Sequence, residues 1–273
     1  MKAPKFDYAK PRSLDAAIRL LADAGDAGKV IAGGQSLGPI LNFRLAQPEL
    51  LVDVRGLPEL AAVRDEGDSV FLGACTTHAA IEDGRVPDPT HGLLPAVART
   101  IAYRAVRNRG TLGGSLAHAD PAADWVNVMA LLDAEIVARG PAGERRMRAS
   151  EFVRGPLTTA LAADEIITGV RVPKLSARAR WGHYKFNRKP GEFAEAIGAI
   201  IHDPERGVAR ALIGAIGDAP HVVADARPFV KGFDPGTAEA ALDAAGLPAT
   251  GYERQVHLVA LKRAVMHSAR PGA

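Results

Sequence analysis

Residues 1–55 carry one stretch of helical apolar spacing and two short apolar runs. In 13–24 the apolar residues recur every three or four positions behind Ser13, a residue type that favours a helix N-cap. The runs at 29–32 and 50–54 predict strands, and Pro39 suits the first turn of a helix between them. The pattern therefore predicts a helix followed by a small β-α-β unit.

The middle of the chain mixes short apolar runs with helical spacing. Strands are predicted at 63, 70–74, 135–139, 145–148 and 165–172, and helices at 76–81, 92–103 and 122–132. Pro141, Ala142 and Gly143 predict a hairpin turn. The segment 175–180 is polar and indicates a boundary.

Beyond that boundary, strands precede helices. Strands are predicted at 181–187, 195–202 and 208–217, and helices at 237–245 and 254–267. Consecutive strands followed by helices are typical of an α+β fold. We therefore expect an N-terminal domain over 1–175, with sub-lobes over about 1–55 and 56–175, and a smaller α+β domain over 176–273.

Composition narrows the class of protein. Apolar residues make up 47% of the chain and charged residues 24%, as in soluble globular proteins. There is no apolar run long enough to span a membrane, and the first residues lack an apolar stretch typical of a secretory signal, so we expect a cytoplasmic protein. The net charge of +3 is scattered and aromatic residues are only 5%, which argues against nucleic-acid binding.

The single cysteine, Cys75, excludes an internal disulfide and an iron–sulfur cluster held by this chain alone. We expect it to be a small, half-buried apolar residue in a strand. The histidines lack HExxH spacing and there is no CxxC pair, so no metal site is predicted.

Two glycine clusters stand out in this sequence. Gly110, Gly113 and Gly114 lie in RNRGTLGGSLAHADPAAD, and a second cluster lies in IAGGQS at 31–36. Glycine permits positive φ and close approach of the backbone, and successive N–H groups form a concave site for phosphate oxygens. Two such loops could hold a diphosphate from two sides, although each alone could be an ordinary tight turn. Neither loop is the dinucleotide fingerprint GxGxxG or the P-loop GxxxxGK[ST].

Several polar residues near these loops have two open interpretations. Arg107 and Arg109 could face phosphate, or could be solvated or paired with acids. Asp124 could cap the following helix or contact a ligand. His78 is predicted to be structural or solvent-facing.

The strings AGGQSLGPILNFRLAQPELLVDV and RNRGTLGGSLAHADPAAD resemble those of the FAD-binding medium subunit of the molybdenum hydroxylases, the xanthine dehydrogenase and aerobic carbon monoxide dehydrogenase family. The later segment GHYKFNRKPGEFA adds to the likeness, which covers nearly the whole chain. The resemblance implies a two-lobed FAD-binding domain of the PCMH (vanillyl-alcohol oxidase-like) type, followed by the smaller α+β domain.

The resemblance also implies cofactor-binding residues and noncovalent FAD. The positions carried over from the family are Ala32, Gly33, Gly34, Gln35, Ser36, Ile101, Thr111, Leu112, Gly113, Gly114, Ser115, Asp124, Ile167, Lys185 and Phe193. The lysine position carries a one-residue ambiguity with Tyr184. No catalytic residue and no metal ligand is assigned to this chain.

In the family, a large subunit holds the molybdenum cofactor and a small subunit holds two [2Fe–2S] clusters. The resemblance implies that this chain passes electrons from the small subunit to an external acceptor, in a dimer of heterotrimers. Two alternatives stay open: a stand-alone flavin-dependent reductase on the same fold, and a flavin-free scaffold subunit. The substrate would react on another chain, so this sequence does not name it.

Overall fold

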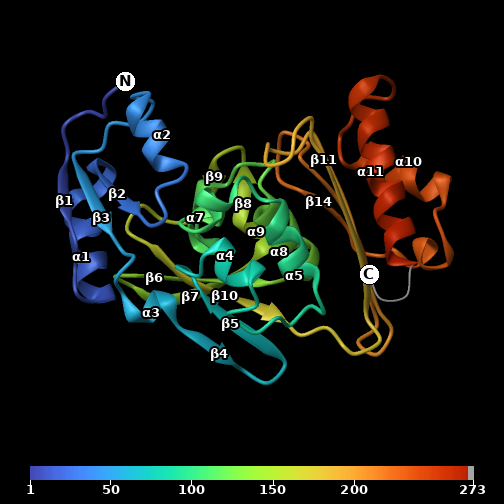
Figure 1. The fold of residues 1–273 in the computed structure, drawn as a ribbon, viewed down its shortest axis with the longest axis horizontal. Coiled ribbons are helices and arrows are strands. Elements are labelled where there is room, and N and C mark those ends of the chain that lie inside the picture. Colours follow the sequence, from blue (N-terminus) through green and yellow to red (C-terminus); the bar gives the residue numbers. More distant parts are fainter. Residues whose placement is uncertain (270–273) are drawn as a thin grey trace.

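The computed structural model describes residues 1–269 and arranges its three larger sheets in a row (Figure 1). A small parallel sheet lies at the N-terminal end, an antiparallel sheet with most of the helices lies in the centre, and a second antiparallel sheet carries the last two helices. This mixture of helices and strands confirms the predicted α+β class.

The N-terminal sheet has the order β1-β3-β2, and all its pairs are parallel. Its elements are β1 (Asp7–Ala9), α1 (Leu14–Ala24), η1 (Gly25–Ala27), β2 (Gly28–Ile31), α2 (Leu37–Asn42) and β3 (Leu50–Asp53). Ser13 caps α1 by accepting a hydrogen bond from the amide of Ala16, at 3.2 Å. The predicted β-α-β unit is therefore confirmed, while β1 was not predicted.

The central sheet has the order β4-β5-β10-β6-β7 and is antiparallel. Its strands are β4 (Val63–Asp65), β5 (Ser69–Gly73), β6 (Glu135–Gly140), β7 (Gly143–Arg148) and β10 (Ile166–Pro173). β6 and β7 form the predicted hairpin, with Gly140 paired to Gly143 across the turn.

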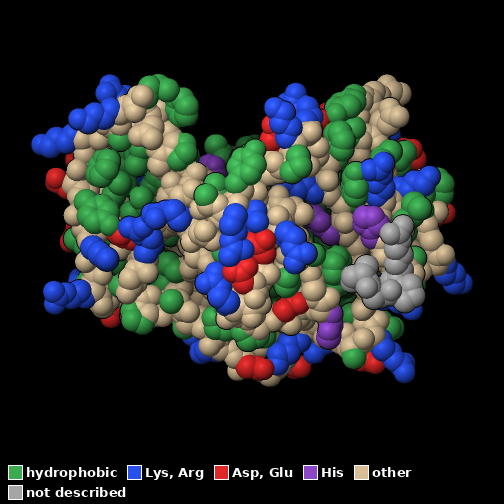
Figure 2. All heavy atoms as spheres, viewed as in Figure 1, with side chains coloured by type: hydrophobic (Ala, Val, Ile, Leu, Met, Phe, Trp, Pro, Cys, Tyr) green, Lys and Arg blue, Asp and Glu red, His purple; other side chains and the backbone are tan. Residues whose placement is uncertain are grey.

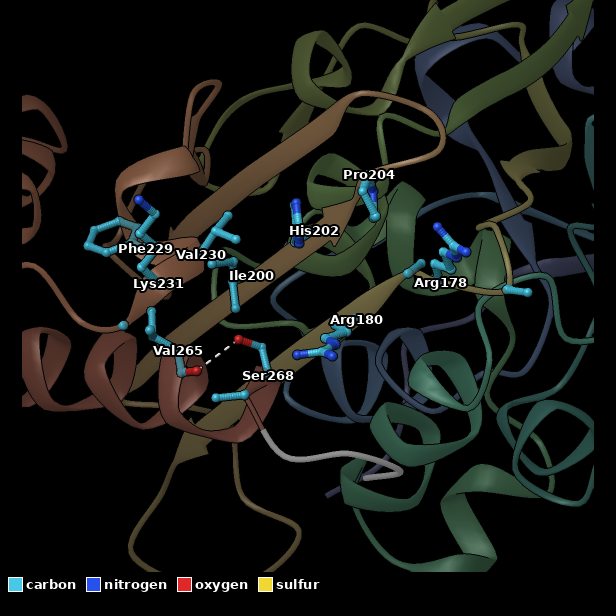
Figure 3. A pocket seen from close by; sticks show the side chains of 14 residues that line it. Arg178, Arg180, Ile200, His202, Pro204, Phe229, Val230, Lys231, Val265 and Ser268 are labelled. Atoms are coloured by element: carbon cyan, nitrogen blue, oxygen red, sulfur yellow. Dashed lines mark hydrogen bonds between the residues drawn. The ribbon is translucent and has the colours of Figure 1, made fainter.

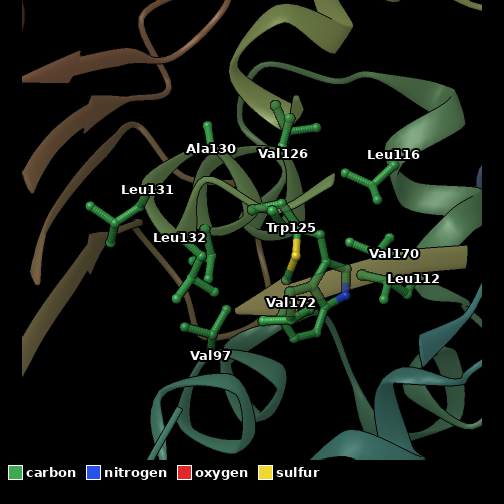
Figure 4. Packing of buried hydrophobic residues seen from close by; sticks show 14 of the residues in the cluster. Val97, Leu112, Leu116, Trp125, Val126, Ala130, Leu131, Leu132, Val170 and Val172 are labelled. Carbon is green, nitrogen blue, oxygen red and sulfur yellow. The ribbon is translucent and has the colours of Figure 1, made fainter. Parts of the chain in front are cut away.

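Helices and a short hairpin complete the centre. These are α3 (Pro58–Ala61), α4 (His78–Glu82), α5 (Leu93–Thr100), α6 (Arg104–Arg107), α7 (Leu112–His118), α8 (Asp124–Leu132), α9 (Ala149–Phe152), β8 (Val153–Gly155) and β9 (Thr158–Thr159). Every residue of α8 is buried, and Trp125 packs among aliphatic side chains that include Leu112 and Val172 (Figure 4). The helix predicted over 92–103 ends early, at Thr100.

The C-terminal sheet has the order β11-β12-β13-β14. Its elements are β11 (Arg180–Phe186), β12 (Ala196–Asp203), β13 (Val208–Gly214), β14 (His221–Val223), η2 (Arg227–Lys231), α10 (Pro235–Ala244) and α11 (Tyr252–Ser268). The strand predicted over 208–217 ends at Gly214, because Ala215 has a positive φ of 62°. α11 lies so close to the sheet that a Cβ on Gly182 would stand 1.9 Å from a helix carbonyl.

The largest hydrophobic core crosses the predicted domain boundary. Trp125 and Met129 of α8 belong to the same cluster as Ile197 and Leu212 of the C-terminal sheet. The division at residue 175 therefore stays a prediction. Among residues 1–269, no helix is both long and apolar enough to cross a membrane.

Candidate functional site

A cavity of about 710 Å³ lies where the three sheets approach one another. In Figure 2 the surface is hollowed between the N-terminal part and the C-terminal sheet. Every predicted cofactor-binding residue except Leu112 lines this cavity, although the residues span 32 to 193 in the sequence. Their gathering around one cavity is a finding of the structure, and their contact with FAD stays a prediction.

Leu112 lies outside the cavity. Its side chain is fully buried in the hydrophobic core, and its amide donates to the carbonyl of Thr76, at 2.9 Å. Both the side chain and the N–H group are therefore occupied within the protein. The sequence placed Leu112 at the site only because it lies inside the second glycine motif.

The first glycine loop, residues 32–36, presents backbone donors to the cavity. The amides of Gly33, Gly34, Gln35 and Ser36 have no acceptor within the described part of the chain. The Gln35 side chain donates to the Gly33 carbonyl, at 3.1 Å, and Gly34 has a φ of 71°. Four successive N–H groups without an acceptor among the described residues are therefore available to an anionic ligand in the cavity.

The second glycine motif is built differently from the expected loop. Thr111 caps α7, so Gly113 and Gly114 are helical residues with negative φ. Gly113 donates to the Ala74 carbonyl, at 2.9 Å, Gly114 to Thr111 Oγ1, at 3.1 Å, and Ser115 to the Thr111 carbonyl, at 3.0 Å. The expectation of free N–H groups and positive φ is therefore wrong here. These glycines permit close packing, because a Cβ on Gly113 would lie 2.5 Å from Ala74 Cβ.

The two motifs are in direct contact at the base of the cavity. A Cβ on Gly33 would stand 2.2 Å from the carbonyl oxygen of Arg109 and 2.8 Å from Gly110 Cα. Only glycine permits two backbones to approach so closely. Residue 33 therefore sets the spacing between the two loops.

A buried ion pair joins the central part to the C-terminal sheet at the cavity wall. Lys185 Nζ lies 2.8 Å from Asp124 Oδ2, and the two side chains are 5% and 4% exposed. Thr100 adds its hydroxyl to Asp124, at 3.4 Å. The helix-cap alternative for Asp124 is wrong, because the cap residue is Ala123 and Asp124 is the first residue of α8.

Of the two alternative residues Tyr184 and Lys185, only Lys185 lies at the cavity. Lys185 lines the cavity, whereas the Tyr184 ring packs under the guanidinium of Arg263, 4.7 Å from the ring centre. Successive residues of a strand point to opposite faces, so only one of the two can face the cavity.

Arg107 is paired with an acid. Its guanidinium donates to both carboxylate oxygens of Glu82, at 2.7 and 2.9 Å, and to the carbonyls of Ile101 and Ala102, both at 3.0 Å. The phosphate alternative for Arg107 is therefore wrong. Arg109 is exposed, and its role stays open.

Cys75 and His78 are among the cavity residues that the predicted site did not include. Cys75 is half-buried just after β5, and burial raises the pKa of its thiol to about 11, which keeps it protonated at neutral pH. His78 is buried and accepts a hydrogen bond from Trp125, so its structural alternative holds and the solvent-facing one is wrong. Neither residue belongs to a glycine motif, so no local pattern marked it as part of the cavity.

A second cavity of about 690 Å³ lies in the C-terminal part (Figure 3). Its lining combines three cationic side chains, Arg178, Arg180 and Lys231, with apolar residues such as Ile200. It contains none of the predicted cofactor residues. Over residues 1–269, no group of three or more His, Cys, Asp or Glu is placed to hold a metal ion.

A family model, curated relatives and solved structures all relate this chain to the same family. Residues 4–175 match the family described as the FAD binding domain in molybdopterin dehydrogenase. The chain is 38% identical to the nicotine 6-hydroxylase medium subunit of Paenarthrobacter nicotinovorans, over 94% of this chain and 91% of the relative. It is 39% identical to the 6-hydroxypseudooxynicotine dehydrogenase complex subunit alpha of the same organism, over 80% and 74% of the two chains.

Among solved structures, a chain of carbon monoxide dehydrogenase from Hydrogenophaga pseudoflava superposes with a TM-score of 0.89. That chain is 32% identical, and the match covers 98% of both chains. The structural match therefore includes the C-terminal sheet as well as the FAD-binding domain. The chain therefore belongs to the family of FAD-binding medium subunits of molybdenum hydroxylase-type dehydrogenases.

Proposed function

We propose that this chain is the FAD-carrying electron-transfer subunit of a molybdenum-dependent hydroxylase. It takes electrons from a small subunit with two [2Fe–2S] clusters and delivers them to an external acceptor, while a large subunit with the molybdenum cofactor oxidises the substrate. The observation that carries the proposal is the row of four free N–H groups in the first glycine loop, at the cavity wall.

The residues present fit FAD. A dinucleotide cofactor has an anionic diphosphate at its centre, and Gly33, Gly34, Gln35 and Ser36 offer unpaired donors for it. The cavity volume of about 710 Å³ falls within the usual range for ligand sites. Apolar side chains such as Ile101 and Ile167 share the wall with these polar groups.

Each part of the wall has a task toward the cofactor. The first loop binds the diphosphate through its amides, and the second motif brings the backbone and the Ser115 hydroxyl close to it. The pair of Asp124 and Lys185 fixes α8 against β11 with little access to water. Phe193, 58% exposed at the cavity, offers an apolar face to a flat ring system. When bound, FAD supplies the one- and two-electron redox chemistry that amino acids lack.

The partner subunits and the cytoplasmic location are part of the same proposal. A relative is named as subunit alpha of a dehydrogenase complex, which supports assembly with other chains. We propose a dimer of heterotrimers, in which substrate oxidation requires no acid or base from this chain.

The test is reconstitution with the copurifying small and large subunits. Substrate should bleach the flavin absorbance of the assembled complex and leave that of the isolated, FAD-loaded chain unchanged. Bleaching of the isolated chain by substrate would contradict the carrier role and favour a stand-alone reductase. A purified chain that binds no FAD at all would favour a scaffold.

A further inference from the structure

His78 is a titratable side chain at the cavity wall that the proposed function does not use. It is the first residue of α4, directly after the cap Thr77, and it is 6% exposed. Its amide donates to the carbonyl of Gly110, at 3.0 Å, which ties it to the start of the second glycine motif. His78 is among the residues that line the cavity.

Trp125 fixes which nitrogen of His78 carries the proton. The indole Nε1 of Trp125 lies 2.9 Å from His78 Nδ1, in a buried hydrogen bond. An indole N–H can only donate, so Nδ1 must be the acceptor and the neutral ring carries its proton on Nε2. Burial, aided by the charge of Arg107, lowers the pKa of His78 to about 4, so the ring is neutral at pH 7.

The Nε2–H group is open to the cavity. Nε2 has no hydrogen-bond partner among the described residues, yet it is not fully enclosed, in contrast to Nε2 of His183 and Nε2 of His257. Nε2 and Cδ2 lie 2.7 and 2.8 Å from the place where Gly110 would carry a Cβ. Gly110 also lines the cavity, so the donor stands beside the second motif and within the accessible space.

We propose that His78 is a further cofactor-binding residue, which donates one hydrogen bond from Nε2 to a phosphate or ribose oxygen of FAD. The inference rests on the proposed function. The amides of Leu112, Gly113, Gly114 and Ser115 are already bonded within the protein, so a side-chain donor at this position replaces the donor that the backbone of the second motif does not provide. Residue 110 has to be glycine, because a side chain there would displace the imidazole.

Two substitutions separate the two roles of the ring. In His78→Asn the amide oxygen occupies the place of Nδ1 and can still accept from Trp125, whereas its NH₂ group takes the place of Cδ2 and falls short of the position of Nε2. In His78→Gln the longer side chain places its NH₂ group near the position of Nε2. His221→Asn on β14, outside the cavity lining, is the matched control for the same chemical change.

The experiment titrates the flavin-stripped full chain with FAD and follows quenching of flavin fluorescence. We expect His78→Asn to raise Kd by about ten- to a hundredfold, as for a lost hydrogen bond to a charged group. His78→Gln should recover most of that loss, and His221→Asn should bind like the wild type. Urea unfolding of each apo variant separates weaker binding from weaker folding.

Nitrogen NMR of the ¹⁵N-histidine-labelled wild type supplies a readout that needs no variant. The apo chain should show His78 as the Nε2–H tautomer, and saturation with FAD should shift that Nε2–H signal. A wild-type Kd in His78→Asn, a proton on Nδ1, or an Nε2–H signal that FAD leaves unmoved would each overturn the assignment. If the wild type binds no FAD, the proposed function fails as well, whereas normal wild-type binding with any of those three results removes His78 alone.

Discussion

Replacement of Gly33 by alanine tests the contact between the two glycine loops. The added Cβ would lie 2.2 Å from the Arg109 carbonyl oxygen and 2.8 Å from Gly110 Cα. Both are backbone atoms, so no side-chain rotation can relieve the overlap. Gly33 itself has no positive φ, and the effect of the substitution is therefore purely one of space.

The size of the effect follows from these distances. An ordinary contact needs 3.4 Å, which is 1.2 Å more than the 2.2 Å available, so one loop must move by that order. Overpacking of this kind costs roughly 1–3 kcal/mol of folding free energy. A shift of about 1 Å stretches a hydrogen bond beyond its useful length, and loss of two bonds to an anion would weaken binding by more than about a hundredfold.

The assay compares Gly33→Ala with Gly38→Ala in the flavin-stripped full chain. Gly38 lies in α2, a Cβ there would meet nothing within 4 Å, and alanine should stabilise that helix by roughly 0.5–1 kcal/mol. FAD fluorescence titration gives Kd, and urea unfolding gives the folding free energy. A wild-type Kd and urea midpoint in Gly33→Ala would refute the loop contact, and an equal loss of binding in Gly38→Ala would show that the contact is not the cause.

Three further results are expected from other parts of the chain. Removal of one charge of the buried pair, by Asp124→Asn or Lys185→Met, should cost about 3–5 kcal/mol of folding free energy, and the double variant should recover part of it in urea unfolding. Gly182→Ala should lower stability by at least about 1–3 kcal/mol, since its Cβ would meet a carbonyl of α11 at 1.9 Å; an unchanged urea midpoint would contradict that docking. Burial lowers the pKa of both His78 and His183 from 6.5 to about 4. The two neutral rings therefore contribute fully to the folding free energy above pH 6.5, and this contribution is lost as the pH falls toward 4. Between pH 7 and pH 4, urea unfolding should show a loss of folding free energy of up to about 3 kcal/mol for each histidine. His78→Gln should lose less folding free energy over this range than the wild type.

The sequence predicted elements whose signal is local. α1 has a cap and an apolar face within twelve residues, and the hairpin of β6 and β7 has its turn residues between two strands. α7 gave no such signal, since two glycines interrupt its apolar spacing. Tertiary contacts hold it instead, through the Thr111 cap and the packing of Gly113 on Ala74. Very short strands such as β14, three residues long, are likewise defined by their partner strand.

For the site, resemblance to a family supplied positions that spacing alone could not. The two glycine clusters were visible, but their different construction depends on which amides find acceptors elsewhere in the fold. His78 was missed as a cavity residue because its partner Trp125 lies 47 residues away. Arg107 was ambiguous for the same reason, since Glu82 lies 25 residues away.

The register of β11 connects the C-terminal sheet to the cavity. Because side chains alternate along a strand, Lys185 points to Asp124 on one face while Gly182 and Tyr184 point to α11 on the other. A slip of one residue would bury Tyr184 against Asp124 and push Lys185 into the helix. Gly182, which admits α11, therefore also fixes the face on which the lysine emerges. Close packing far from the cavity thus decides which side chain completes its wall.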